Sequence, residues 1–437
     1  MRLDRAVAND KWRDLFPNSQ IEHLACARSD HYPIVLKVCS AEQFQPRRKC
    51  LHYEIFWERE PESAEVIQET WSAEGEKSDL ADISRALGKL MSGLHSCSKK
   101  KCKNVGREIE KGRKKLSSLL ESNADSAAIR LATDQLNELL YREEMLWLQR
   151  SKIDWLKEGD RNTKFFHSKA VWRAKKNKIS KLRDSEGTVH SSTNVLEQMS
   201  TDYFKEIFSA DPSLDHSKVT RLIQSKVTPE MNENLCREFT DEEIANAIFQ
   251  IGPLKAPGPD GFPARFYQRN WGILKEDVSR AVKSFFRSGV LSEGVNDPAI
   301  VLIPKVEHPI ELIEFRPISL CNVIYKVVSK CLVNRLRPML DEIISCNQSA
   351  FVPGRMITDN ALIAFECFHY LQKNKNPDNA ACAYKLDLSK AYDWHFLEQS
   401  MLRLGFSHRW VSWIMECITT VRYSVKFNGS LLSTFAP

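Results

Sequence analysis

The sequence predicts a multidomain protein of mixed α/β and α+β class. Three observations indicate this class: the length of the chain, its composition, and a pattern of apolar residues that changes along it. The chain has 437 residues, which at roughly 150 residues per domain allows about three domains. Hydrophobic residues make up 42% and charged residues 27%, so wholesale disorder and low-complexity classes are excluded.

Charge, hydropathy and cysteine usage exclude further classes. The 63 basic and 57 acidic residues leave a net charge of +6, too small an excess over this length to indicate nucleic-acid binding by itself. Mean hydropathy is −0.40, and charges occupy the start of the chain, so we expect neither a membrane span nor a secretion signal. The 12 cysteines contain no Cys-x-x-Cys, which favours reduced thiols over disulfides or a zinc site.

The amino-terminal half predicts a short β segment followed by helices. Residues 1–40 alternate apolar and polar positions and end in a strand over Pro33–Val38, too short for a domain alone. Residues 50–208 place apolar side chains at helical spacing, which predicts a long antiparallel helical hairpin. By count, residues 54–82 hold ten acids and two bases, whereas 99–115 hold nine bases and two acids. The near-neutral average therefore hides a basic patch.

A second basic block interleaves cations with aromatic residues. Residues 150–183 hold twelve Lys or Arg and three acids by count. Such a block suits nucleic acid, because cations neutralise phosphates and aromatic rings stack on unpaired bases. The alternative is a solvated helix face whose aromatic residues turn into a core. The aromatic residues are Trp155, Phe165, Phe166, His167 and Trp172.

The carboxyl-terminal half alternates helices and strands. Thr240 opens a capping box, so a short helix begins there and ends before Gly252-Pro253. The loop Ala256–Gly261 is either a ligand clamp or a structural corner. Apolar strands follow at 299–303 and 315–318, with Lys305 and Arg316 beside them, and a core helix carries Val323 to Leu332 inward. Taken alone, each of these cations is more often a solvent-exposed residue than a functional one, and the same holds for Arg355, which follows Gly354.

The segment Cys382–Asp393 carries the candidate chemistry. Its apolar strand delivers Asp387, and a carboxylate so placed can hold Mg²⁺, which prefers oxygen ligands. Phosphoryl transfer uses such ions, two of which stabilise the attacking and leaving oxygens. Tyr392 lies five residues further on, and its ring could pack against the sugar of a nucleotide. Taken alone the pattern is weak, because an aspartate that ends a strand is more often a turn or cap residue.

The order of six segments is more specific than any one of them. Together they resemble the reverse transcriptase of LINE-type (non-LTR) retrotransposons, especially those abundant in plant genomes, over nearly the whole chain. The segments are WLKEGDRNTKFFH (155–167), KAPGPDGFPARFY (255–267), VLIPK (301–305), FRPISLCNVIYKVVSK (315–330), QSAFVPGR (348–355) and KLDLSKAYD (385–393).

The resemblance implies a role for each matching residue. Asp387 corresponds to the first metal-binding aspartate of the palm, and Tyr392 to the aromatic residue that screens the sugar of the incoming nucleotide. Lys305 and Arg316 correspond to fingers cations that meet the triphosphate. Arg355, with Gly354, and the loop Pro257–Gly261 correspond to motifs that line the template and nucleotide path. We interpret Asp393 as structural, orienting the turn. The implied cofactor is Mg²⁺, and the implied partners are an RNA template, a DNA target and deoxynucleoside triphosphates, with no membrane.

The amino end carries a second resemblance. Arg2-Leu3-Asp4-Arg5 and Ser29-Asp30-His31 resemble the last two motifs of the apurinic-type endonuclease that precedes the transcriptase in these elements. The resemblance implies that His31 acts at the scissile phosphate while Asp4 orients its imidazole. Taken without the family, a histidine beside an aspartate is mostly a surface turn. The expected organisation is an endonuclease remnant over 1–40, a basic helical linker over 41–238, and fingers with an incomplete palm over 239–437.

The chain also departs from the family. Trp394 follows Asp393 directly, where the family inserts about three residues, and the sequence stops before the Ala-Asp-Asp segment that supplies two of three palm carboxylates. The endonuclease motifs upstream of Asp4 are likewise missing. We therefore expect this chain alone to be an inactive fragment of an RNA-directed DNA polymerase whose family role is target-primed reverse transcription.

Two other functions stay open at the level of sequence. One is a non-catalytic remnant that still binds nucleic acid, in a nuclear or cytoplasmic ribonucleoprotein. The other is a helical scaffold for protein contacts over 50–208, which leaves the later motifs unexplained. We further expect Lys305, Arg316 and Asp387 to face one cleft and Asp4 to lie beside His31.

Overall fold

The computed structural model describes most of the chain in two compact units, residues 1–49 and residues 50–437. The main described ranges are 51–101, 105–122, 124–151, 163–209, 216–374 and 393–436. Shorter described stretches are 7–9, 12, 16, 19–23, 34–38, 381–384 and 386.

The described part of the first unit contains a small β-hairpin. Strands β1 (Gln20–His23) and β2 (Ile34–Lys37) pair antiparallel, with Gln20 opposite Lys37. The strand predicted over Pro33–Val38 is therefore confirmed as β2. Asp4 and His31 lie outside the described residues, so their proximity and the endonuclease resemblance stay predictions.

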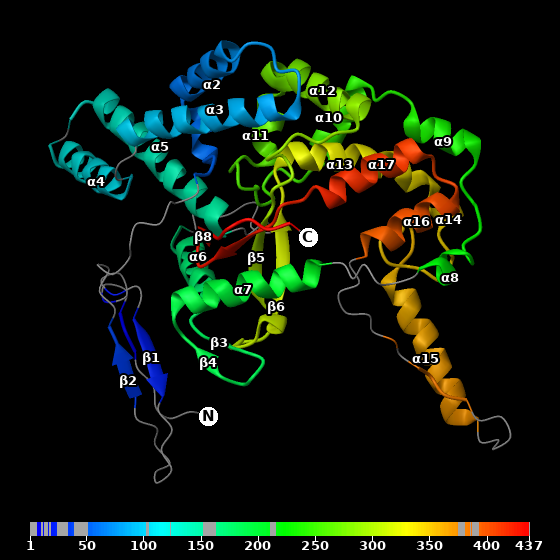
Figure 1. Ribbon diagram of the computed structural model, residues 1–437. Helices are drawn as coiled ribbons and strands as arrows, with labels where there is room; N and C mark the ends of the chain where they lie inside the picture. Colours follow the sequence, from blue (N-terminus) through cyan, green and yellow to red (C-terminus); the bar gives the residue numbers. More distant parts are fainter. Residues whose placement is uncertain are drawn as a thin grey trace, which may run out of the picture. The chain divides into compact units, whose positions relative to one another are not determined.

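The second unit is mainly helical with small sheets, which confirms a mixed α/β class (Figure 1). Short 3₁₀ segments are η2 (Ile55–Arg59), η3 (Leu312–Glu314) and η4 (Arg337–Met339). The helices are α2 (Pro61–Ala73), α3 (Leu80–Lys101), α4 (Val105–Glu121), α5 (Ser126–Ser151), α6 (Thr163–Lys176), α7 (Thr193–Phe208), α8 (Ser217–Thr220), α9 (Pro229–Cys236), α10 (Asp241–Phe249), α11 (Ala264–Arg269), α12 (Trp271–Ser288), α13 (Val323–Leu336), α14 (Leu340–Ile343), α15 (Ile357–Lys373), α16 (Trp394–Leu404) and α17 (His408–Thr419). Among these described helices, none has both the length and the apolar character that crossing a bilayer requires.

The described residues of this unit form two sheets. Strands β3 (Leu182–Arg183) and β4 (Val189–His190) form a short antiparallel pair. A four-stranded sheet has the order β6-β5-β7-β8 and is built from β5 (Ala299–Pro304), β6 (Phe315–Leu320), β7 (Ser424–Phe427) and β8 (Ser430–Leu431). Strand β5 pairs antiparallel with β6 but parallel with β7, so the last strands of the chain complete a sheet begun more than 100 residues earlier.

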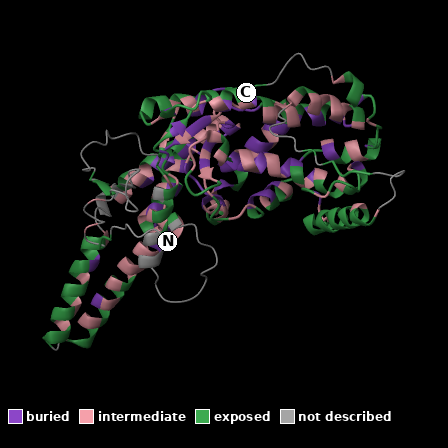
Figure 2. Ribbon diagram, turned by 90° about the horizontal axis from the view of Figure 1, so that it is seen from below, coloured by how far each residue is buried: buried purple, intermediate pink, exposed green. Residues whose placement is uncertain are grey.

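The main core joins helices from both halves of this unit (Figure 2). Buried side chains of α3 share one cluster with those of α10, α12, α13 and α17. Helix α10 begins where predicted, since the Thr240 side chain accepts from the Glu243 N–H and Glu243 accepts from the Thr240 N–H. All six apolar residues predicted to face inward on α13 are buried, namely Val323, Ile324, Val327, Val328, Cys331 and Leu332.

The predicted helical hairpin is formed by α4 and α5. Gly112 on α4 lies where a Cβ would come within 3.2 Å of Leu136 on α5, so a residue without a side chain allows this close approach. Helix α15 differs from the helices of the core, since none of its residues is buried. The limits expected for the domains, at residues 40 and 238, stay predictions.

Candidate functional site

The exposed side of the four-stranded sheet gathers three cations. Side chains alternate between the two faces of a strand, and paired residues on neighbouring strands share a face. Arg316 pairs with Ile303, and Lys426 pairs with Val301. Lys305 lies two residues beyond Ile303, and its N–H donates to the Glu314 carbonyl, so the pairing continues to this position. We name this side the cationic face; it consists of Val301, Ile303, Lys305, Arg316, Ile318, Lys426 and Leu431.

The opposite face of β5 and β7 is buried and fixes the register of these two strands. Ile300, Leu302 and Val425 are at most 3% exposed and pack in one cluster with Phe204 and Phe208 of α7. A shift of one residue in either strand would turn these apolar side chains to solvent and bring Lys305 or Lys426 into the core. In β6 only Phe315 is buried on this face, so Arg316 is placed by its pairing with Ile303.

The cations of this face are available to an anion. Lys305 and Arg316 are exposed, and Lys426 is half-buried. Lys305 Nζ donates to the Ile313 carbonyl over 2.9 Å, a single contact at the tip of the β5–β6 hairpin. Within the ranges that the structure describes, no hydrogen bond or ion pair engages the Arg316 guanidinium. The shared face of Lys305 and Arg316 agrees with the predicted cleft, whereas Asp387 lies outside the described residues.

The loop Ala256–Gly261 packs against the end of β6. A Cβ on Gly258 would lie 2.3 Å from Asn322 Oδ1, so only glycine fits there. Asn322 Oδ1 in turn accepts from the Asp260 N–H over 3.2 Å, and Lys326 Nζ donates to the Ala256 carbonyl over 3.2 Å. These contacts make the loop a rigid corner that joins the sheet to the helical core. The role in lining the template path that the resemblance implies stays a prediction.

Asp260 is the most perturbed acid of this corner. Burial raises its pKa to about 7, although its Oδ1 accepts from the Phe262 N–H and the Lys326 ammonium lies nearby. Burial also lowers the pKa of Lys326 and raises that of Cys321. The Tyr267 pKa is well above its ordinary value, through burial and the Asp260 charge, and its hydroxyl has no hydrogen-bond partner among the described residues. Burial thus leaves Asp260 about half protonated near pH 7, although the Phe262 N–H and the Lys326 ammonium both favour its ionised form.

Replacing Gly261 by alanine is expected to lower the free energy of unfolding by about 2–3 kcal/mol. Gly261 has φ +78°, and a Cβ there would lie 2.2 Å from the Leu51 carbonyl oxygen, so both a left-handed backbone and a clash oppose the side chain. Urea denaturation followed by circular dichroism measures the change. The matched control is Gly289→Ala, at φ +72° with nothing within 4 Å, which isolates the backbone cost at about 1–2 kcal/mol. Equal losses in both variants would contradict the clash.

Arg355 has a different setting from the other predicted cations. Its guanidinium donates to Asp341 Oδ1 from Nε over 3.2 Å and from Nη2 over 3.0 Å. The same group donates to the carbonyls of Ser345, Gln348 and Ile344. Its side chain is only 17% exposed, so it closes the loop after α14. Its assignment to nucleotide binding stays a prediction, and the site described here does not depend on it.

The residues around the predicted metal site are described only in part. Asp387 and Tyr392 lie outside the described residues. Asp393 accepts from the Phe396 N–H as the N-cap of α16, and its other oxygen lies 2.7 Å from His216 Nε2, which agrees with its structural interpretation. Over the described ranges, no group of three or more His, Cys, Asp or Glu side chains could hold a metal ion. The fit of Asp387 to Mg²⁺ therefore rests on the sequence motif.

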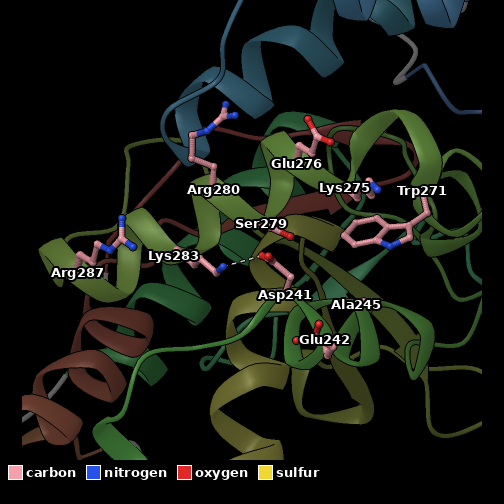
Figure 3. A pocket seen from close by; sticks show the side chains of 10 residues that line it. All are labelled: Asp241, Glu242, Ala245, Trp271, Lys275, Glu276, Ser279, Arg280, Lys283 and Arg287. Carbon is pink, nitrogen blue, oxygen red and sulfur yellow. Dashed lines mark ion pairs between the residues drawn. The ribbon is translucent and has the colours of Figure 1, made fainter.

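A separate groove lies between α10 and α12 (Figure 3). It encloses about 710 Å³, and cations and acids alternate along its walls. Lys283 pairs with Asp241 at 2.7 Å inside the groove, and Arg280 pairs at 3.0 Å with Asp277, which does not line it. Because these cations already have acidic partners, the cationic face is the stronger candidate for binding phosphate groups.

Lys426 was missed by reasoning from the sequence. Strand β7 ends in the turn Asn428-Gly429, where both residues have positive φ. Val425 and Phe427 are fully buried, so alternation places Lys426 on the other face. The alternation is visible in the sequence, but the parallel pairing with β5 that puts Lys426 on the same face as Lys305 and Arg316 is not.

Comparison with known proteins identifies the class of this region. Residues 303–436, which include the three cations and Asp387, match the family model for reverse transcriptase (RNA-dependent DNA polymerase). Over 293 residues, 66% of this chain, the sequence is 27% identical to the "Transposon TX1 uncharacterized 149 kDa protein" of Xenopus laevis. The match covers 22% of that protein, so the chain spans well under half of its relative.

Residues 303–436 are therefore similar to reverse transcriptases, and a larger part of the chain is similar to a transposon protein. Both similarities agree with what the six ordered motifs predict. The resemblance of the amino end to an endonuclease stays a prediction.

Proposed function

We propose that this chain provides the fingers and part of the palm of an RNA-directed DNA polymerase that acts in target-primed reverse transcription. The observation that carries the proposal is the cationic face, where Lys305 and Arg316 share one side of a sheet within the matched region. Preorganised cations on a rigid surface stabilise a triphosphate, because they need no rearrangement when the charge arrives. Lys426 adds a third positive group to the same surface.

The remaining roles follow from the motifs. We assign Asp387 to a magnesium ion, Tyr392 to the sugar of the incoming nucleotide, and Arg355 to the nucleotide path. Magnesium would neutralise charge on the phosphates and lower the barrier to transfer. The proposed substrates are an RNA template, a DNA target that supplies the primer, and deoxynucleoside triphosphates. At the amino end, we assign Asp4 and His31 to an endonuclease remnant.

Replacing Arg316 by alanine is expected to weaken binding of a deoxynucleoside triphosphate by about 10- to 100-fold. A hydrogen bond to a charged group contributes about 1.5–3 kcal/mol, and Arg316 has no competing partner within the described ranges. The measurement is equilibrium binding of a labelled triphosphate to the chain loaded with an RNA template and a DNA primer. Lys305→Ala should give a similar loss. Lys218→Ala, which removes an exposed cation on α8, is the control and should bind normally. Normal binding by both sheet variants would refute the assignment.

Primer extension with and without Mg²⁺ tests the chemistry itself. A two-metal site needs more than one carboxylate, and the motifs assign Asp387 as one of them, so any nucleotide incorporation should require both Mg²⁺ and Asp387. Incorporation that persists in Asp387→Ala would contradict the assignment of a metal ion to this residue.

The alternative of a non-catalytic nucleic-acid-binding protein has one specific observation in its favour. Helix α4 exposes Arg107, Lys111, Arg113 and Lys114 along its length. Such a surface binds phosphates without regard to sequence, and its affinity falls as salt concentration rises. RNA binding that survives Arg316→Ala, together with normal binding of the triphosphate in that variant, would favour this alternative.

A further inference from the structure

The basic block over 150–183 separates its aromatic residues into two environments. Phe166 on α6 is buried at 4% exposure, as a core residue should be. Trp172, less than two turns further along the same helix, is 57% exposed. An exposed tryptophan carries the largest apolar surface of any side chain, and Trp172 leaves more than half of its surface to solvent. The interpretation as a core therefore applies to Phe166, and the interpretation as a nucleic-acid surface applies to Trp172.

Two lysines flank the exposed ring. Lys169 precedes Trp172 by three residues and Lys176 follows it by four, so all three side chains lie on one face of the helix. The ammonium groups lie 5.9 Å and 5.0 Å from the centre of the indole ring. A base stacked on the indole would therefore have a positive group within reach of the phosphate on either side. An apolar protein surface would instead have to desolvate both ammonium groups.

Helix α6 is held in a fixed position on the sheet that bears the cationic face. Immediately after the helix, the Ile179 N–H donates to Asn428 Oδ1 over 2.9 Å, and Asn428 Nδ2 donates to the Ile179 carbonyl over 2.8 Å. Asn428 belongs to the turn between β7 and β8, and the Ile179 side chain is buried in the core of that sheet. The Arg183 N–H also donates to the Ile310 carbonyl, next to the tip of the β5–β6 hairpin. A ligand at Trp172 is thus held at a defined place relative to Lys426.

We propose that Trp172, Lys169 and Lys176 form a stacking site for an unpaired base of single-stranded nucleic acid. The indole supplies the stacking surface and the two lysines contact the adjacent phosphates. The inference deepens the proposed function, on which it rests, by adding a second contact for the single strand outside the cationic face. Both RNA and DNA single strands offer this chemistry, so the experiment has an arm for each.

The test compares single-strand affinity of four variants in the full chain. Fluorescence anisotropy with labelled 12-nucleotide RNA and DNA oligomers gives the dissociation constants. Trp172→Ala should weaken binding by about 5- to 150-fold, the range that loss of one stacked base implies. Trp172→Phe keeps an aromatic ring and should recover most of the affinity. Lys176→Gln should reduce the slope of log affinity against log salt concentration by about 0.7. The control is Phe249→Ala on α10, an aromatic residue of similar exposure that should have no effect.

The outcomes separate this inference from the proposed function. A stronger effect with RNA would identify the template as the bound strand, and a stronger effect with DNA would identify the target strand; either supports the site. Trp172→Ala that binds both oligomers normally would overturn it, as would equal losses in Trp172→Ala and Trp172→Phe. If the proposed function were wrong, Arg316→Ala would bind the triphosphate normally. That measurement does not involve Trp172, so the two failures can be distinguished.

Discussion

Replacing Arg335 by methionine is expected to lower the free energy of unfolding by about 3 kcal/mol. The Arg335 guanidinium is buried and donates to both carboxylate oxygens of Glu243 over 3.0 Å and 2.9 Å. It also donates to the carbonyls of Leu235, Arg237 and Glu238, and it lies 3.3 Å from the centre of the Phe239 ring. Loss of one partner of a buried ion pair costs about 3–5 kcal/mol, and the lower end applies because Glu243 is 26% exposed.

The control for this prediction is Arg287→Met, made on α12. Arg287 pairs with Glu238, but the two side chains are 67% and 66% exposed, and such surface pairs contribute at most about 1 kcal/mol. Denaturation in urea at constant pH and salt measures both variants. If Arg335→Met proved no more destabilising than Arg287→Met, the network around Arg335 would not hold α13 to the segment before α10.

Between pH 4 and pH 7 the free energy of unfolding of the wild-type chain is expected to fall by about 4 kcal/mol because of Asp260, and Asp260→Asn should abolish this fall. In the folded chain, burial raises the Asp260 pKa from 3.8 to about 7. Between these two values, the folded state keeps a proton that the unfolded state has lost, so stability falls as pH rises from about 4 to about 7 and is constant above. Each pKa unit corresponds to about 1.4 kcal/mol, which gives about 4 kcal/mol over the whole interval.

Asparagine cannot ionise, so this loss is absent from the variant. Relative to the wild-type chain, Asp260→Asn should become more stable as pH rises from 4 to 8, as followed by urea midpoints at each pH. Tyr267→Phe is the matched control, since it removes a neighbouring buried hydroxyl without a described partner and should leave the pH dependence in place. Parallel stability curves for the wild-type chain and Asp260→Asn would show that Asp260 is ionised in the folded state throughout.

Local patterns predicted the elements of this chain well. The capping box at Thr240, the inward face of α13 and the strand before Asn428-Gly429 all follow from short-range chemistry, and the structure has each of them. Placement of Lys305 and Arg316 on one face also follows, because an antiparallel hairpin fixes which residues pair. These features depend on neighbours within about 20 residues.

Features that depend on distant partners could not be predicted. The apolar residues between Ala210 and Pro229 show no sustained period, yet Val227 is buried and its N–H donates to the Leu404 carbonyl, 177 positions further along the chain. Burial of Asp260 likewise needs the end of β6, and the place of Lys426 needs a parallel partner strand. In each case the tertiary contact, rather than local preference, decides the environment.

The two hydrogen bonds between Ile179 and Asn428 can form only after the ribosome has synthesised both residues. The two residues lie 249 positions apart. A ribosome adds about 5–20 residues per second, so roughly 12–50 s pass before Asn428 emerges to meet Ile179. For that interval the apolar cluster around Ile179 and Leu182 lacks Val425 and Phe427, so the nascent chain leaves part of this cluster open to chaperones.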